Sequence, residues 1–428
     1  MLQTLQQQGL RHVVLCPGSR SGPLALAAAG LKRSGLITLS TAIDERSAGF
    51  HALGRSTASG VATAVITTSG TAVANLLPAA VEADRSSQPL LLISADRPLR
   101  LKNKGANQTV NQEAFLTPVC RWCGSGPLDG LNTGLDHELR ALAQNAWRHL
   151  HQQPGPVHLN VPFEEPLLPD LNQQNAFWNQ WNRSEPEAIT HTPELWTPAS
   201  NNAAPALDPD QPGVIVAGPW RGLSSTLEPY QAALIAWQQR SGWPVLADPL
   251  AAIPNDLSGV IRYWDLLLPH GLSQMPANAQ VLRLGSMPAS RRLEAWLESH
   301  QGPQLLITEA DPRPLDPLEV AQQWSGGLAQ WWQQLSPQLN AIPAGSCAPT
   351  PQTRSVLESW ENADAAVGKR LSALLPIQGA ANEPALMVAL AQLLPAERPV
   401  MLAASSPVRD WQAFAAGDTG RRRCFSFR

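Results

Sequence analysis

Four short apolar runs between residues 12 and 115 each stop abruptly at a group of polar residues. The runs are 12–16, 36–43, 63–68 and 90–94, and they end in turn at Ser/Arg, Asp/Glu, Ser/Gly/Thr and Asp/Arg groups. Helical patterns rich in small residues follow the first three runs, and this alternation predicts a parallel sheet with crossover helices. Ligands of such sheets bind beyond the carboxyl ends of the strands. The sequence therefore predicts a binding site at this edge.

The composition narrows the classes of protein. A length of 428 residues predicts two or three α/β domains, and a net charge of −3 argues against a nucleic-acid binder. No apolar run approaches the roughly 20 residues that span a bilayer, and residues 1–12 lack the pattern of a signal peptide, so we expect a cytoplasmic protein. The five cysteines are scattered, which argues against a disulfide framework. Cys120 and Cys123 have CxxC spacing without a second pair, and a structural role is the simpler interpretation.

The alternation of strand and helix patterns along the chain predicts consecutive doubly wound parallel-sheet domains. Strand and helix patterns place a first α/β domain at 1–165 and a central α/β domain at 213–335. The intervals 166–212 and 336–375, which include Pro-rich stretches without steady periodicity, are expected to be linkers. A third αβ pattern begins at 376–428 and is too short for a domain, so we expect a fragment of a longer protein.

The candidate functional residues lie where the predicted strands end. Ser19 and Arg20 lie before a helix whose first turn favours anions, so a cation there suggests a bound anion, although a solvated loop arginine is an equal alternative. Glu45 begins the next helix, where it either stabilises the helix dipole or handles a proton. Further candidates are Ser69, Gly70 and Thr71 in a strand-to-helix turn, Arg97 with the amides Asn107 and Gln108, the pair Arg291 and Arg292, and Ser405 with Arg409.

Several motifs together resemble one family. They are CPGSRSGPLALA, DERSAGFHALG, TSGTAVANLLPAAVEA, ISADRP and GANQT, followed by GPVHLNVPFEEPL, GSMPASRRLEAW and ASSPVRDWQAFA. In this order and spacing they are similar to the 2-succinyl-5-enolpyruvyl-6-hydroxy-3-cyclohexene-1-carboxylate synthases, thiamine-diphosphate enzymes of menaquinone and phylloquinone biosynthesis. Other thiamine-diphosphate enzymes share the Glu and the SGxxxxN turn, but not CPGSRS or GANQT.

The resemblance implies a transferase that joins decarboxylated 2-oxoglutarate to isochorismate, with thiamine diphosphate and Mg2+ as cofactors. It implies that Glu45 is catalytic and contacts the pyrimidine ring of the cofactor. The implied cofactor-binding residues are Glu45, Ser69, Gly70, Thr71 and Asn75. The implied substrate-binding residues are Ser19, Arg20, Arg97, Asn107, Gln108, Arg291, Arg292, Ser405, Arg409 and Arg428.

The sequence departs from the family pattern in three places. Arg291 stands where relatives usually have Lys, which puts its contact in doubt because the two cations differ in geometry. Ala404 stands where Asn is common. The Gly-Asp…Asn motif for magnesium and diphosphate is missing, since Gly417-Asp418 is the only late Gly-Asp. The resemblance thus places the metal and diphosphate ligands beyond this chain, which holds no metal ligand and is expected to be inactive alone.

Two alternatives stay open at this point. One is another thiamine-diphosphate carboligase, acting on pyruvate-like acids, and the other is a non-catalytic module that binds dicarboxylates. A dinucleotide oxidoreductase is disfavoured because no GxGxxG follows a strand.

The resemblance also bears on the oligomeric state. In the enzyme family, one subunit's pyrimidine-binding domain meets another's diphosphate-binding domain. A full-length homodimer or homotetramer is therefore expected, without a nucleic-acid or membrane partner.

Overall fold

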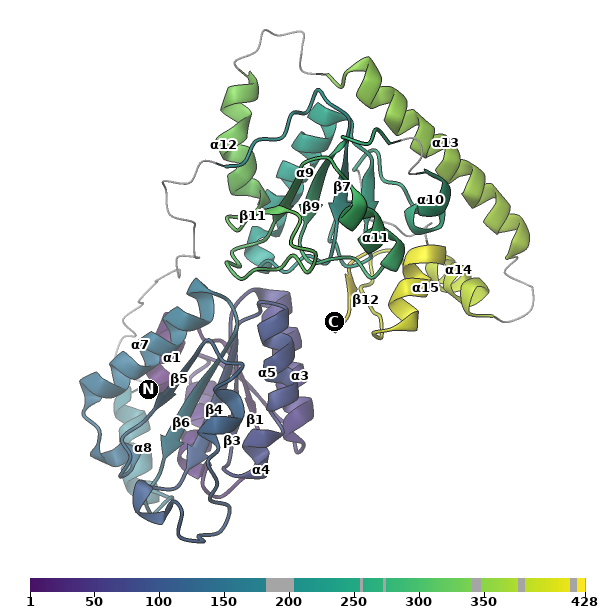
Figure 1. The fold of residues 1–428 in the computed structure, drawn as a ribbon. Coiled ribbons are helices and arrows are strands. Elements are labelled where there is room, and N and C mark those ends of the chain that lie inside the picture. The colour runs from purple at the N-terminus through teal and green to yellow at the C-terminus, as the bar shows by residue number, and fades with distance from the viewer. Residues whose placement is uncertain are drawn as a thin grey trace. The chain divides into compact units, whose positions relative to one another are not determined.

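The computed structural model describes residues 1–181, 204–254, 257–271, 275–340, 348–375, 382–415 and 422–427. The chain divides into two compact units. The first comprises Met1–Trp196 with Leu223–Ser225, and the second comprises Thr197–Gly222 with Thr226–Arg428 (Figure 1).

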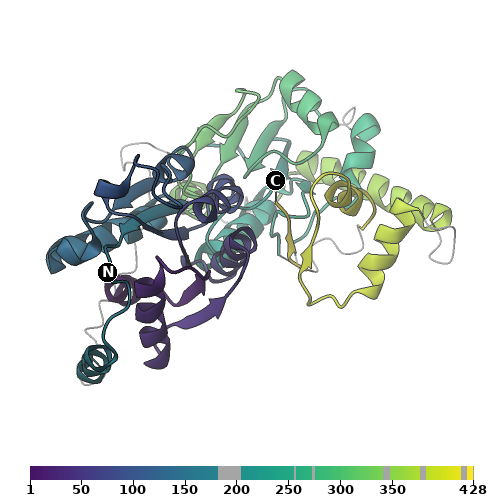
Figure 2. The ribbon, with the colours of Figure 1, turned by 90° about the horizontal axis from the view of Figure 1, so that it is seen from below.

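The first unit is built on a six-stranded, fully parallel sheet in the order β2-β1-β3-β4-β6-β5 (Figures 1 and 2). Its strands are β1 (His12–Leu15), β2 (Thr38–Thr41), β3 (Thr63–Thr67), β4 (Leu90–Asp96), β5 (Trp122–Ser125) and β6 (Pro156–Pro162). Its helices are α1 (Leu2–Gln8), α2 (Gly22–Arg33), α3 (Glu45–Ser59), α4 (Thr71–Ala74), α5 (Leu77–Arg85), α6 (Glu113–Leu116), α7 (Asp136–Gln152) and α8 (Leu171–Trp181), with 3-10 turns η1 (Leu99–Leu101) and η2 (Leu131–Thr133). The predicted strands at 12–16, 36–43, 63–68 and 90–94 are confirmed, and so is the parallel α/β fold.

Alternating side chains of the strands supply two separate cores. Leu91 of β4 packs into the core under α1, α2 and α7, whereas its neighbour Leu92 packs into the core under α3 and α5. This follows from the period of two in a strand, and it explains why strands covered on both faces are continuously apolar. The small residues of α3 and α5 allow a close approach, since a Cβ on Gly49 would lie only 2.7 Å from the Ala79 Cβ.

The interval expected to be the first linker begins with ordered structure. Its helix α8 packs on α2, and the Trp178 ring is buried against Gly30. Any side chain at Gly30 would overlap that ring. The run FWNQW has little helical periodicity, so this contact was not predictable from the pattern alone.

The second unit contains a five-stranded parallel sheet in the order β11-β10-β9-β7-β8. Its strands are β7 (Gly213–Ala217), β8 (Val245–Ala247), β9 (Gln280–Leu284), β10 (Gln304–Ile307) and β11 (Gln322–Trp324). Its helices are α9 (Leu227–Ser241), α10 (Trp264–Gly271), α11 (Arg291–Ser299), α12 (Leu328–Asn340) and α13 (Pro351–Leu374), and the turn η3 (Ser224–Thr226) precedes α9. Trp237, Trp243 and Trp331 are fully buried in one of its cores.

The interval expected to be the second linker, 336–375, is largely helical. The 24-residue helix α13 begins at an N-cap Thr350, whose hydroxyl accepts a hydrogen bond from the Thr353 amide, with Pro351 in the first turn. Trp360 of this helix is buried in the core that it shares with α10 and α11. Burial of one apolar stripe fixes the helix, although most of its residues face water.

The last part of the chain forms a small layer within the second unit. It consists of α14 (Glu383–Leu393), α15 (Ser406–Phe414) and the parallel pair β12 (Val400–Met401) and β13 (Cys424–Phe425). Leu402, Val408 and Trp411 pack together with Leu250 of the central region.

Candidate active site

The candidate site lies at the carboxyl ends of β1, β3 and β4. The chain moves from β1 to β2 on one side and returns to β3 on the other, so the direction of winding changes between β1 and β3. Such a switch point leaves a crevice between the two following loops. Here the loops after β1 and β3 touch, because Gly18 packs on the Thr68 side chain and has no room for a Cβ.

The turn after β3 is shaped by its glycine. Gly70 has a φ of +81°, and a Cβ there would lie 3.5 Å from both the Cβ and the carbonyl oxygen of Gln108. Arg97 Nη1 donates to the Ser69 hydroxyl and, at 3.1 Å, to the Gln108 carbonyl oxygen. The guanidinium of Arg97 therefore joins the turn to the loop that carries Asn107 and Gln108.

The guanidinium groups of Arg20 and Arg97 act on each other electrostatically. Arg20 donates from Nη1 to the Phe163 carbonyl at 3.0 Å and pairs through Nη2 with Glu165 at 3.2 Å. Its Nε is buried and has no hydrogen-bond partner among the described residues. Burial lowers the pKa of Arg97, and the neighbouring charge of Arg20 lowers it further, against the opposing effects of Asp96 and Glu165. A bound anion would relieve both costs.

Glu45 is positioned by helix capping. The Asp44 carboxylate accepts a hydrogen bond of 2.7 Å from the Ser47 amide, which makes Glu45 the first residue of α3. Glu45 Oε2 accepts a hydrogen bond of 3.2 Å from Asn75 Nδ2, so the carboxylate is fixed against the end of α4. The side chain is half-buried, which leaves it accessible to a ligand.

The structure brings together most of the candidates in the first unit. Ser69, Gly70, Arg97 and Gln108 form one contact group, and Glu45 and Asn75 form a second. Thr71 begins α4, and it is exposed together with Ser19 and Asn107.

The candidates in the second unit separate into two groups. Arg291 is exposed at the start of α11, while Arg292 donates to the Asp265 carbonyl oxygen at 3.2 Å. Ser405, with φ of +73°, is the N-cap of α15 and accepts a hydrogen bond of 3.1 Å on its carbonyl oxygen from Arg409 Nε. Arg428 lies outside the described residues.

A buried polar network beneath the site was not predicted. Gln112, fully buried, accepts a hydrogen bond of 3.0 Å from the Gly70 amide and donates to Asn160 Oδ1 at 2.6 Å. Asn160 donates to Asp96 at 2.8 Å. Lys102 then pairs with Asp96 at 2.7 Å and with Glu113 at 2.6 Å. The sequence feature that could have indicated this network is the pair of polar residues, His158 and Asn160, inside an otherwise apolar strand.

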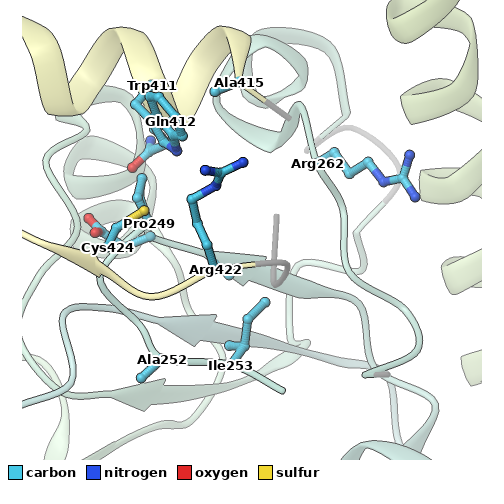
Figure 3. A pocket seen from close by; sticks show the side chains of 11 residues that line it. Pro249, Ala252, Ile253, Arg262, Trp411, Gln412, Ala415, Arg422 and Cys424 are labelled. Carbon is cyan, nitrogen blue, oxygen red and sulfur yellow. The ribbon is translucent and has the colours of Figure 1, made fainter. Parts of the chain in front are cut away.

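A pocket in the second unit carries two further arginines, Arg262 and Arg422 (Figure 3). Arg422 points toward Trp411 and Gln412 in this view. Its guanidinium donates to the carbonyl oxygens of Ala391, Leu394 and Pro395 at 3.0–3.3 Å. Arg422 therefore caps the carboxyl end of α14, where a cation is favourable.

Two features are absent from the described ranges. No group of three or more His, Cys, Asp or Glu residues is arranged to hold a metal ion. None of the helices there has both the length and the apolar character needed to cross a membrane.

The fold and the site define a thiamine pyrophosphate enzyme. The N-terminal thiamine-pyrophosphate-binding domain of these enzymes matches residues 1–115, and their middle domain matches residues 175–402. The chain is 82% identical over 428 residues to the 2-succinyl-5-enolpyruvyl-6-hydroxy-3-cyclohexene-1-carboxylate synthase of Synechococcus sp. (strain CC9311), covering all of this chain and 74% of the relative. The synthases of Synechococcus sp. (strain WH7803) and Prochlorococcus marinus (strain MIT 9313) are 59% and 55% identical, over 100% and 98% of this chain and 73% of each relative.

The chain belongs to the 2-succinyl-5-enolpyruvyl-6-hydroxy-3-cyclohexene-1-carboxylate synthase family. The resemblance inferred from the motifs is thereby confirmed. The roles of the individual residues stay predictions.

Proposed function

We propose that this chain takes part in the transfer of the succinyl-carrying unit of decarboxylated 2-oxoglutarate to isochorismate, a step of menaquinone or phylloquinone biosynthesis. The observation that carries the proposal is the pair of adjacent guanidinium groups, Arg20 and Arg97, at the switch point of the first sheet. Family membership supports the same reaction.

Arg20 and Arg97 would bind the carboxylates of isochorismate. A carboxylate between them would use the unpartnered Nε of Arg20 and offset the repulsion that acts on Arg97. Ser69 and the Gln108 loop are held by Arg97, so they would complete the contacts to the hydroxyl groups. Ser19 and Asn107 are exposed beside them and would add polar contacts.

The residues around Glu45 fit the pyrimidine ring of thiamine diphosphate. A half-buried carboxylate with one oxygen already held by Asn75 is well suited to hold or move a proton at a ring nitrogen. In the Ser69–Thr71 turn, Gly70 has no side chain. Its backbone would therefore allow a flat ring to approach the turn. When bound, the cofactor supplies the nucleophilic carbon and the electron sink for decarboxylation.

Other parts of the proposal rest on the family alone. Arg291, Arg292, Ser405, Arg409 and Arg428 would complete the substrate pocket. Mg2+ would accompany the cofactor, and the enzyme would be a cytoplasmic homo-oligomer.

The proposal can be tested by calorimetric titration of isochorismate into the protein and into the Arg97→Met and Arg20→Met variants. Loss of a charge-assisted hydrogen-bonding group, about 1.5–3 kcal/mol, should weaken binding about 10- to 150-fold. Arg33→Met, at the exposed end of α2, is the matched control and should bind as the wild type does.

Three results would contradict the assignment. The first is equal affinity of all four proteins for isochorismate, and the second is no binding by any of them. The third is tighter binding of pyruvate than of isochorismate by the wild type, which would favour a carboligase of pyruvate-like acids.

A further inference from the structure

A second chemical cluster lies at the edge of the first sheet. Cys120 follows α6, and Cys123 lies on β5, which forms the outer edge of the sheet. Both residues are half-buried free cysteines, and their thiols are hydrogen-bonded to each other. Two thiols that interact in this way are close enough in sequence and space to form a disulfide.

His158 provides the chemical partner of the two thiols. In the parallel pairing of β5 and β6, Cys123 stands directly opposite His158, so their side chains share one face of the sheet. His158 Nε2 is hydrogen-bonded to the Ser94 hydroxyl at 2.7 Å, on the β4 side of the ring. Nδ1 is buried and has no hydrogen-bond partner in the described part of the chain, and the ring lies near enough to Cys123 to lower the pKa of its thiol.

The surroundings favour the thiolate of Cys123. The hydrogen bond from Cys120 lowers the pKa of Cys123, and His158 and Thr117 lower it further, against the effect of burial. The same hydrogen bond and burial raise the pKa of Cys120. The pair thus has one nucleophilic and one protonated sulfur, as thiol–disulfide exchange requires.

We propose that Cys120 and Cys123 form a redox-active dithiol that is converted reversibly to a disulfide by low-molecular-weight disulfides such as glutathione disulfide. The Cys123 thiolate attacks one sulfur of glutathione disulfide, and one glutathione thiolate leaves. The Cys120 thiol then loses its proton to solvent and attacks the Cys123 sulfur of the mixed disulfide. The second glutathione leaves as a thiolate, so two thiols are oxidised and one glutathione disulfide is reduced to two glutathione molecules.

Hydrogen bonds of the polar network connect His158, beside the dithiol, to the candidate site. His158 bonds Ser94, Gln112 Nε2 donates to Ser94 at 3.2 Å, and Gln112 Oε1 accepts from the Gly70 amide. Oxidation of Cys123 changes the group that lies opposite His158 from a thiol to a disulfide. We expect the amide of Gly70 to exchange faster with solvent in the oxidised protein than in the reduced protein.

The test is equilibration with glutathione buffers of increasing disulfide content, followed by alkylation of free thiols and peptide mass analysis. The expected product has one disulfide between Cys120 and Cys123, while the buried Cys16 and Cys424 stay reduced. Cys120→Ser should stop at a glutathione adduct on Cys123, and Cys123→Ser should give no fast reaction at Cys120. Cys424→Ser is the control and should react as the wild type does.

A second measurement separates this proposal from two merely adjacent structural cysteines. The alkylation rate of Cys123 against pH should reach half its maximum below the usual thiol range near 8.5, and His158→Gln should move that midpoint upward. The proposal is overturned if Cys120 and Cys123 stay reduced in glutathione disulfide alone. It is also overturned if Cys123 titrates near 8.5 in both proteins.

Discussion

Replacement of Gln112 by Leu tests whether the buried network supports the turn after β3. The side chain is fully buried and makes hydrogen bonds to the Gly70 amide, the Ser94 hydroxyl, the Ala95 carbonyl oxygen and Asn160. Leu has a similar volume, so the loss of these bonds dominates over any cavity.

The magnitude follows from the groups that are left behind. The Gly70 amide loses its acceptor and costs about 1–3 kcal/mol as an unsatisfied buried donor. Asn160 Oδ1 keeps the Ser94 hydroxyl as a donor at 3.0 Å, so its loss is smaller, about 1 kcal/mol. The sum, about 2–4 kcal/mol, corresponds to an opening equilibrium constant of the turn that is about 30- to 700-fold larger, and to amide exchange that is faster by the same factor.

Hydrogen–deuterium exchange followed by mass spectrometry of peptides that span Gly70 is the appropriate assay, because it reports the local opening free energy. Gln152→Leu, at the exposed end of α7, is the matched control and should change exchange by less than about threefold. If Gly70 exchanges within threefold of the wild type in Gln112→Leu, the network does not stabilise the turn and the reasoning is refuted.

Two further predictions concern the stability of the first unit. Burial lowers the pKa of His151 to about 4, against the effect of its hydrogen bond to the Trp147 carbonyl, so the ring stays neutral when folded. The unfolded chain takes up this proton near pH 6.5, so about 3 kcal/mol of stability present above pH 6.5 should be lost as the pH falls to 4. An NMR titration of His151 with a midpoint above pH 6 would contradict this. Gly30→Leu should destabilise by about 1–3 kcal/mol in urea because its side chain overlaps the Trp178 ring, whereas Gly54→Ala, in open space on α3, should stabilise by about 0.5–1 kcal/mol. Equal unfolding midpoints for these two variants would show that α8 does not pack as described.

The apolar runs predicted the inner strands of the first sheet well because these strands are buried on both faces. Residues 63–68 and 90–94 are continuous in hydrophobicity, and β3 and β4 are buried along their whole length. Their polar ends predicted the position of the candidate site for the same reason, since the carboxyl ends of parallel strands meet at one edge. The strands β5 and β11 were not predicted, because edge strands of three or four half-polar residues have no distinctive periodicity.

The partners within the site could not be predicted, because they are distant in sequence. Arg20 contacts the Phe163 carbonyl across 143 positions, and Ser94 contacts His158 across 64. A loop such as 102–112 is polar whether it faces water or folds inward, so the burial of Gln112 appears only in the structure. Helix α13 was hidden by its mostly exposed surface, on which only Thr353 and Trp360 are buried.

The ion pair between Arg20 and Glu165 bears on how many negative charges a ligand of the crevice would need. The Arg20 side chain is 11% exposed, whereas the Glu165 side chain is 69% exposed and can leave into water at a cost of about 0–1 kcal/mol. Glu165 is thus a counterion already in place at Arg20. If the crevice binds carboxylates as proposed, a ligand with one carboxylate at Arg20 Nη2 would replace one ion pair by another and gain little, whereas a ligand with two would engage Arg97 as well. The crevice would then discriminate between ligands by their number of charges.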